Sequence, residues 1–290
     1  MEILDVHSVD GAHSSLFVGE GLEASAPLLW LQPAMGVEAR WYAPLAEPAA
    51  RRGLRLVRAD LRGHGSSSLR PSRAVDFGFR DIVEFDLPAQ LAVLEARFPD
   101  APVLLAGHSL GGLLSLLFGA RRPGQVEGVA CLAAGSIYHR AWKGGPYPSA
   151  GVWVATQSMG LLARAMGWFP GSLVGFGGRE SRDLMRDWSR QARTGRFKSK
   201  GLDYDVDLRR CRTSCLFLSL EGDKLAPTGA VDDLARRIPS RRAHRIHLSV
   251  PDLSRPHFDW VKRGDAILEA VQTWRASRAS RARSETTRRA

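Results

Sequence analysis

The sequence predicts an α/β fold, in which a mostly parallel central sheet is covered by helices on both faces. Short apolar segments alternate with helical segments along most of the chain, which is typical of such a sheet. Several apolar segments lack polar alternation, as expected for strands that are buried on both faces. The length of 290 residues suits one large domain, with or without an insertion, and 44% hydrophobic with 24% charged residues excludes wholesale disorder.

The predicted elements follow one another in the order that a parallel sheet requires. The first part of the chain supplies a hairpin at 1–20 that turns at Asp10-Gly11, a strand at 27–32, a helix at 38–52, a strand at 54–59, a helix at 80–98 that Pro88 should kink, a strand at 103–106, a helix at 110–121 and a strand at 126–133. The last part supplies a strand at 215–220, a helix at 228–238, a strand at 243–248 and a closing helix at 258–274.

Two segments break this alternation. Residues 136–205 contain Gly144-Gly145-Pro146 and Pro170-Gly171 and do not read as strand–helix–strand, so we expect an insertion over the carboxyl edge of the sheet. The core is then formed by residues 1–135 and 206–274. Residues 275–290 are mainly Arg, Ala, Ser and Thr with nothing to bury, and we expect a basic disordered tail.

The formal charge of +11 is concentrated in two segments. Residues 179–200 and 275–290 carry five net positive charges each, so the rest of the chain is nearly neutral. The basic residues are mostly Arg and the chain contains no Asn, a compositional bias that by itself indicates no partner. Because no RNA- or DNA-binding motif accompanies the basic segments, we do not expect a nucleic acid as a partner.

The cysteine content and the N-terminus indicate the expected compartment and whether a cofactor is expected. The three cysteines, Cys131, Cys211 and Cys215, exclude a disulfide scaffold, and no second Cys/His pair stands at zinc-ligand spacing. We expect reduced buried thiols, no metal and no cofactor. No signal peptide is visible, and the apolar stretches are far shorter than the ~20 residues of a membrane span. These features predict a soluble cytoplasmic protein.

The strongest functional signal is Gly107-His108-Ser109-Leu110-Gly111, which lies between an apolar strand and an apolar helix. This pattern predicts a sharp strand-to-helix turn that exposes the Ser109 hydroxyl, with small residues at Gly107 and Gly111 so that strand and helix can approach. The N-terminus of the helix offers free N–H groups to a developing anion. Ser109 is therefore the predicted nucleophile.

A serine nucleophile needs a base, and the base needs an acid that orients it. With this type of turn, the order along the chain is serine, acid, histidine. Asp223, in the turn after strand 215–220, is the predicted acid, with Glu221 as its rival. His257, before the closing helix, is the predicted base. The remaining histidines that could compete are assigned packing or structural roles: His64, His108, His244 and His247.

These motifs resemble those of the α/β-hydrolase superfamily over nearly the whole chain, from residue 27 to the closing helix. Residues 107–112 resemble its nucleophile elbow, 59–66 its loop after the preceding strand, 222–227 its acid turn and 256–258 its histidine loop. The nearest branch is that of the serine aminopeptidases and monoacylglycerol-lipase-like hydrolases, and within it a bacterial group of predicted hydrolases. The resemblance implies an α/β-hydrolase fold with an inserted cap, and a triad of Ser109, Asp223 and His257.

The chain departs from the superfamily at the loop that should complete the oxyanion hole. Alignment on Trp41-Tyr42-Ala43-Pro44-Leu45 places Pro33-Ala34 where the superfamily usually has His-Gly. The resemblance then implies the N–H groups of Met35 and Leu110 as the oxyanion donors, because Pro33 has no N–H. A lost donor can cost ~10²–10³ in rate, so the departure bears on efficiency rather than on the reaction class.

The inserted segment has two features that could select a substrate. Its aromatic residues favour either an apolar acyl or aryl pocket or a small core within the cap; they are Trp142, Tyr147, Trp153, Trp168, Phe169, Phe176 and Trp188. Arg182, Arg186 and Arg190 share one helical face. They predict either a cationic rim that attracts a carboxylate or phosphate substrate, or a solvated face of Arg–Asp pairs.

The sequence therefore predicts a serine hydrolase that cleaves a small or medium ester through an acyl-enzyme intermediate. Amides and peptides are further substrate classes that the same groups could cleave. An acyltransferase that uses the same intermediate is one alternative. A non-catalytic ligand-binding protein of the same fold is the other. The oligomeric state is not predicted.

Overall fold

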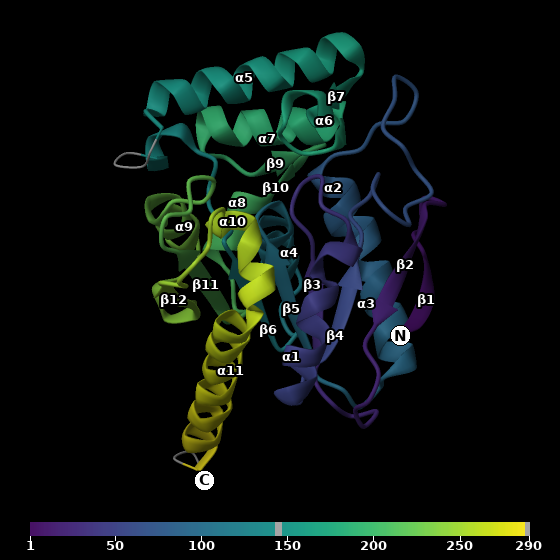
Figure 1. Cartoon of the computed structure of the whole chain (residues 1–290), viewed down its shortest axis with the longest axis vertical. Helices are drawn as coiled ribbons and strands as arrows, with labels where there is room; N and C mark the ends of the chain where they lie inside the picture. Colours follow the sequence, from purple (N-terminus) through teal and green to yellow (C-terminus); the bar gives the residue numbers. More distant parts are fainter. Residues whose placement is uncertain (143–146, 288–290) are drawn as a thin grey trace.

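The computed structural model describes residues 1–142 and 147–287. Its centre is an eight-stranded sheet with the order β1-β2-β4-β3-β5-β6-β11-β12 (Figure 1). The β1–β2 and β2–β4 pairings are antiparallel and all the others are parallel, which confirms the predicted mostly parallel sheet. The strands are β1 (Glu2–His7), β2 (His13–Val18), β3 (Leu28–Gln32), β4 (Arg55–Ala59), β5 (Val103–His108), β6 (Gly128–Leu132), β11 (Cys215–Leu220) and β12 (Ala243–Leu248).

Helices cover both faces of the sheet, and each face has its own apolar core. Because neighbouring strand residues point to opposite faces, Leu28 and Trp30 of β3 enter one core, whereas Leu29 and Leu31 enter the other. The first core is completed by α3 (Leu87–Arg97), α4 (Leu110–Arg121), α8 (Tyr204–Arg209) and α9 (Thr228–Ala235). The second core is completed by α1 (Ala46–Arg51) and α11 (Gly264–Thr287).

Prolines divide two of the predicted helices. The expected helix at 38–52 is a 3₁₀ helix (Ala39–Leu45) followed by α1, and Pro44 lies inside its first part, where it removes a donor. The expected helix at 80–98 consists of α2 (Phe79–Asp81), a π-helical segment (Ile82–Asp86) and α3. Pro88 lies in the first turn of α3, where a missing N–H is tolerated. The kink that was expected at Pro88 is therefore replaced by the π-helical segment just before this proline.

The C-terminal tail differs from the expectation of disorder at 275–290. The closing segment forms α10 (Pro256–Asp259), a 3₁₀ helix (Trp260–Arg263) and α11, which continues to Thr287. Arg275 donates its Nε–H to Glu127 at 2.9 Å, and Nη1 of Arg278 lies 3.6 Å from the same carboxylate. These ion pairs tie the helix to the core at Arg275 and Arg278, and the high helix propensity of Arg and Ala favours its continuation. Residues 288–290 lie outside the described residues.

The segment at 136–205 lies between β6 and β11, and none of its strands joins the central sheet. We call it the insertion. It contains a 3₁₀ helix (His139–Trp142), α5 (Ser149–Met166), β7 (Trp168–Pro170), α6 (Gly171–Val174), β8 (Arg179–Ser181), α7 (Arg182–Thr194), β9 (Lys198–Ser199) and β10 (Leu202–Asp203). The first turn of α8 closes it. Gly144-Gly145-Pro146, which helped to predict this segment, lies outside the described residues.

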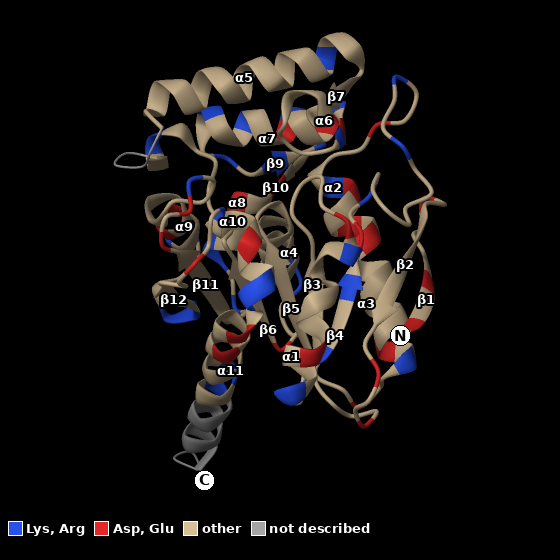
Figure 2. Cartoon of the chain, in the orientation of Figure 1, with Lys and Arg blue, Asp and Glu red and all other residues tan. Residues whose placement is uncertain are grey.

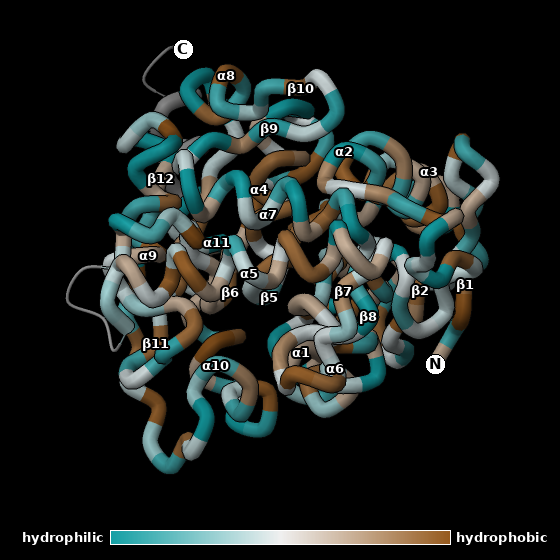
Figure 3. Tube along the Cα trace, turned by 90° about the horizontal axis from the view of Figure 1, so that it is seen from above, coloured by the Kyte–Doolittle hydropathy of each residue, from teal (hydrophilic) through white to brown (hydrophobic). Residues whose placement is uncertain are grey.

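The insertion covers one end of the sheet. Its two long helices, α5 and α7, pack against each other; a Cβ on Gly160 of α5 would lie 2.7 Å from the Ser189 hydroxyl of α7. The side view in Figure 1 and the view from above in Figure 3 agree that both helices lie over β5 and β6. Among the described residues, none of the helices combines the length and hydropathy that a membrane span requires.

The close approach of β5 to α4 gives a stability prediction. A Cβ on Gly107 would lie 2.3 Å from the carbonyl carbon and oxygen of Gly111. We expect Gly107→Ala to lower the free energy of unfolding by about 3 kcal/mol, because backbone atoms cannot move aside as a flexible side chain can. Urea denaturation measures this change. The control is Gly151→Ala in α5, whose Cβ would have ordinary contacts of 3.4 Å; equal effects of the two variants would contradict the prediction.

Candidate active site

Ser109 occupies the turn between β5 and α4, as the sequence predicted. Its backbone has φ 52° and ψ −118°, a region that residues with side chains rarely populate. A Cβ on Gly112 would lie 2.6 Å from the Gly107 oxygen, so both positions must stay small. The Ser109 N–H donates to the carbonyl of Leu132 on β6 at 3.0 Å, which ties the turn to the next strand. The strained turn thereby presents Ser109 at the carboxyl edge of the sheet.

Asp223 and His257 meet directly although 34 residues separate them in the sequence. His257 Nδ1 lies 2.8 Å and 3.1 Å from the two carboxylate oxygens of Asp223, and both side chains are buried. Asp223 also accepts backbone N–H groups from Leu225 and Ala226 at 2.8 and 2.9 Å. Because the carboxylate only accepts, Nδ1 carries the proton, and Nε2 of the neutral imidazole is left as an acceptor.

The loop before His257 is held by a residue that the sequence analysis did not identify. Asp259 accepts hydrogen bonds from the Ser254 hydroxyl at 2.8 Å and from the Arg255 N–H at 3.0 Å. These bonds, with Ser254 first, lower the pKa of Asp259 to about 2. The carboxylate therefore stays ionised at ordinary pH and fixes the start of α10, which carries His257. The short spacing from Ser254 to Asp259 is a local signal that could have indicated this turn.

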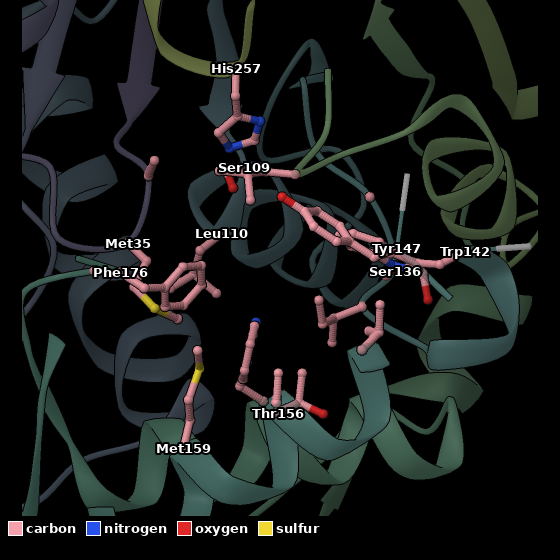
Figure 4. A pocket seen from close by; sticks show the side chains of 18 of the residues that line it. Met35, Ser109, Leu110, Ser136, Trp142, Tyr147, Thr156, Met159, Phe176 and His257 are labelled. Carbon is pink, nitrogen blue, oxygen red and sulfur yellow. The ribbon is translucent and has the colours of Figure 1, made fainter. Parts of the chain in front are cut away.

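Ser109 and His257 line one cavity of about 430 Å³, and Asp223 lies behind His257. Figure 4 shows the two side chains together at one end of the cavity. The cavity wall is apolar except for a few hydroxyl and imidazole groups. Its lining from the core includes Ala34, Met35, Leu110, Leu113 and Leu225, and its lining from the insertion includes Trp142, Tyr147, Val152, Ala155, Thr156, Met159, Phe176 and Trp188.

The backbone around Ser109 supplies two free N–H groups. We call residues 33–38, which follow β3, the Pro33 loop. The Ala34 N–H donates to the Tyr42 hydroxyl at 3.0 Å. Within the described residues, the N–H groups of Met35 and Leu110 have no protein acceptor, and both residues line the cavity. These two N–H groups are therefore available as donors at the cavity, whereas the Ala34 N–H already has an acceptor.

His108 is a buried structural residue rather than a second base. It is fully buried, and the Tyr42 hydroxyl lies 2.8 Å from its Nδ1. The same hydroxyl accepts the Ala34 N–H at 3.0 Å, so it is hydrogen-bonded to both residues. Burial and the neighbouring His257 hold the pKa of His108 well below its usual range, so it stays neutral. Tyr42 thus connects the nucleophile turn to the Pro33 loop, a link that no sequence pattern indicated.

The rival residues lie away from this arrangement. Glu221 is exposed, whereas Asp223 is buried beside His257. His247 on β12 lies 2.9 Å from the Ser219 hydroxyl, and the ring of His244 on the same strand packs at a tilt against Trp274. His64 is largely shielded from solvent beside Glu180 of the insertion, with 3.2 Å between Nε2 and Oε1. None of these groups lines the cavity.

The three arginines of the predicted rim do not line the cavity either. Arg182 pairs with Asp76 at 2.7 Å, Arg186 with Asp183 at 2.7 Å, and Arg190 with Asp187 at 3.3 Å. Figure 2 shows the acidic and basic residues of α7 and its surroundings next to one another. These ion pairs favour the other expectation, a solvated face of Arg–Asp pairs, over a cationic substrate rim.

The aromatic residues of the insertion divide between the two predicted roles. Four of them line the cavity: Trp142, Tyr147, Phe176 and Trp188. The other three do not: Phe169 is buried in a core, Trp168 lies under the guanidinium of Arg179 at 4.1 Å, and Trp153 is exposed on α5. Within the described residues, no cluster of three or more His, Cys, Asp or Glu side chains could hold a metal ion.

Parts of the sequence are similar to those of characterised hydrolases and related proteins. The chain is 30% identical over 106 residues to the monoglyceride lipase of Rattus norvegicus, a match that covers 37% of this chain and 34% of the lipase. It is 44% identical over 78 residues to the biotin biosynthesis bifunctional protein BioHC of Cellvibrio japonicus, which covers 26% of this chain and 15% of that protein. The matched stretches thus span about a third or less of these relatives.

Similarity of fold extends over the whole chain. The crystal structure of the Paleococcus ferrophilus monoacylglycerol lipase superposes with a TM-score of 0.61 at 16% identity, covering 96% of this chain and 99% of that one. The family model described as serine aminopeptidase, S33, matches residues 26–197, which is more than half of the chain and includes the predicted nucleophile. This chain therefore belongs to the serine aminopeptidase S33 family of the α/β-hydrolase superfamily.

Proposed function

We propose that the protein is a serine hydrolase that cleaves a neutral carboxylic ester with a small or medium acyl group. The observation that carries this proposal is the contact of Asp223 with His257, whose ring lies with Ser109 at one cavity wall. The name of the rat relative, a monoglyceride lipase, supports an ester as the substrate. The same catalytic groups can also attack amides, so the choice of an ester rests on this relative and on the apolar cavity.

The proposed reaction proceeds through two acyl transfers. Ser109 Oγ attacks the ester carbonyl carbon while its proton passes to Nε2 of His257. When the tetrahedral intermediate collapses, the bond to the alcohol oxygen breaks, and His257 returns the proton to that oxygen. A water molecule then attacks the acyl-enzyme with the same proton transfers and releases the acid. Asp223 keeps the imidazole in the required tautomer and stabilises the imidazolium that forms.

The oxyanion would be stabilised by the N–H groups of Met35 and Leu110. Leu110 is the first residue of α4, so its N–H is one of the free donors at a helix N-terminus. Donors held in place before the reaction strengthen their bonds as charge develops on the carbonyl oxygen, and each is worth ~10²–10³ in rate. Pro33-Ala34 is compatible with this role, because the donor that the hole needs belongs to the next residue.

We further propose that the insertion is a cap that determines the acyl group. Val152, Ala155 and Met159 of α5 line the cavity. Figure 4 shows Met159 and Thr156 of this helix on the side opposite Ser109, where an acyl chain would extend. No Lys, Arg, Asp or Glu is among the described residues of the lining. An ionised substrate would lose its hydration there without a counter-charge, which is costly. The cavity therefore favours uncharged acyl groups.

The nucleophile is tested by labelling with a fluorophosphonate. We expect the wild-type protein to be labelled and to hydrolyse nitrophenyl esters, and Ser109→Ala to lose both activities by at least 10³-fold, because no other group can form the acyl-enzyme. The control is Ser115→Ala, which removes a buried hydroxyl from the same helix. Labelling of Ser109→Ala at the wild-type rate would refute the proposal. Labelling without hydrolysis of any ester would point to acyl transfer to another acceptor.

The acyl side of the cavity is tested by chain-length preference. We expect Ala155→Trp to fill part of the cavity and to move the preference toward short acyl chains, with a loss in kcat/KM of about fourfold for each methylene that is no longer accommodated. The matched control is Val154→Trp, which places the same side chain on the exposed face of α5. Rates with nitrophenyl esters of increasing length give the profile. An unchanged profile for Ala155→Trp would show that the acyl group lies elsewhere.

The arginine pairs of α7 give a prediction about charge. We expect the triple variant Arg182→Gln, Arg186→Gln, Arg190→Gln to keep the ratio of kcat/KM between neutral and anionic esters within twofold, because these groups pair with carboxylates away from the cavity. Parallel assays with a neutral ester and a dicarboxylic half-ester measure this ratio. A tenfold loss of kcat/KM confined to the anionic ester would instead support a cationic substrate rim.

A further inference from the structure

We propose that His64 and Glu180 are a positioning pair that holds the Met35 N–H in place as an oxyanion donor. The pair would act through contact between two backbone segments: the Pro33 loop of the core and residues 175–178 of the insertion, which we call the Gly177 loop. This inference rests on the proposed function, since it assigns the geometry of the same oxyanion hole to residues outside the cavity.

The two loops touch backbone to backbone. Gly36 of the Pro33 loop has φ +71°, and a Cβ there would lie 2.3 Å from the Gly177 carbonyl carbon and from the Gly178 nitrogen. A Cβ on Gly177 would lie 3.2 Å from the Met35 sulfur. No side chain separates the segments at this point. A movement of the Gly177 loop toward the Pro33 loop would therefore displace Gly36 and the adjoining Met35 peptide. A movement away from it would leave a gap beside Gly36.

The position of the Gly177 loop is fixed by Glu180. The Gly178 N–H donates to Glu180 Oε1 at 2.8 Å, and His64 Nε2 lies 3.2 Å from the same oxygen. The Glu180 side chain is 1% exposed and that of His64 is 10% exposed, so solvent screens this pair weakly. A Cβ on Gly178 would lie 2.7 Å from His64 Nε2, which places the imidazole directly against the Gly177 loop.

The opposite side of the Pro33 loop is held independently by the core. Tyr42 accepts the Ala34 N–H at 3.0 Å, and Asp60 accepts the Ala39 N–H at 2.6 Å. A Cβ on Gly111 would lie 2.4 Å from the carbonyl oxygens of Gln32 and Pro33, so the start of the loop also abuts α4. Between these anchors, the insertion contacts the loop next to the Met35 peptide at Gly36.

The pair also makes this contact dependent on pH. The charged groups that face His64 are Glu180 from β8 and Asp60 from the end of β4. Burial alone would disfavour the imidazolium, but these carboxylates, Glu180 foremost, outweigh it and raise the pKa of His64. The ion pair is therefore complete below about pH 6.5, the unperturbed value, and is lost as the pH rises through the raised pKa of His64. Above that pH the imidazole is neutral, and Glu180 loses the cation that faces it.

The test compares Glu180→Ala with Glu180→Gln. Alanine removes both the acceptor for Gly178 and the partner of His64, so we expect kcat for a nitrophenyl ester to fall about tenfold with KM within twofold, because an oxyanion donor acts mainly in the transition state. Glutamine keeps an acceptor oxygen without the charge, and we expect it to retain kcat within threefold at pH 6.5. In the wild type, kcat should decline at alkaline pH, whereas Glu180→Gln should show no such decline.

Two controls separate this role from general loosening and from failure of the proposed function. Lys200→Gln removes another ion pair between the insertion and the core, the one with Asp81, and should leave kcat and its pH profile unchanged. Fluorophosphonate labelling of Ser109 shows whether the serine is the nucleophile at all. If the wild type is labelled and turns over, but Glu180→Ala keeps kcat or Glu180→Gln keeps the alkaline decline, the positioning proposal is wrong and the hydrolase proposal stands.

Discussion

The structure of the site depends on one steric constraint, the contact between the end of β5 and the start of α4. Gly107 and Gly111–Gly112 allow the strand and the helix to approach to a distance that no side chain would permit. Ser109 absorbs the sharp change of direction with φ 52°, at a cost of the order of 1–3 kcal/mol. The two apolar cores on either side of the sheet balance that cost. The same turn exposes the hydroxyl and sets the Leu110 N–H beside it.

The other groups of the site are organised by burial of polar atoms. The two carboxylate oxygens of Asp223 are hydrogen-bonded to His257 and to two backbone N–H groups. The Asp259 carboxylate likewise accepts a backbone N–H in the turn that starts α10. The chain from Ala34 through the Tyr42 hydroxyl to His108 occupies one loop donor and leaves the next one free. At Asp223 and at Tyr42, a buried acceptor takes up one neighbouring donor: the Nδ1 side of His257 in the first case and the Ala34 N–H in the second.

The sequence predicted those features that arise from neighbouring residues, and it predicted less well those that arise across long separations. The strand–serine–helix turn and the turn after β11 have local signatures, and the order of acid and base follows from them. By contrast, Arg182 meets Asp76 across 106 positions, and nothing in the spacing of the arginines along one face of α7 reveals those partners. Arg275 of α11 likewise pairs with Glu127, which is 148 residues before it. The contact of Gly36 with Gly177 and Gly178 has no sequence signature at all.

The contact of Gly36 with Gly177 and Gly178 limits how the insertion can change during evolution. If the insertion only roofed the cavity, it could be exchanged between relatives as a separable module that alters the accepted acyl group and nothing else. Here its backbone abuts the loop that carries Met35. An exchanged insertion would have to reproduce the path of the Gly177 loop as well as the shape of the cavity. The two proposals together therefore predict that substrate range and turnover are coupled in this protein, so that exchanging the insertion would change both.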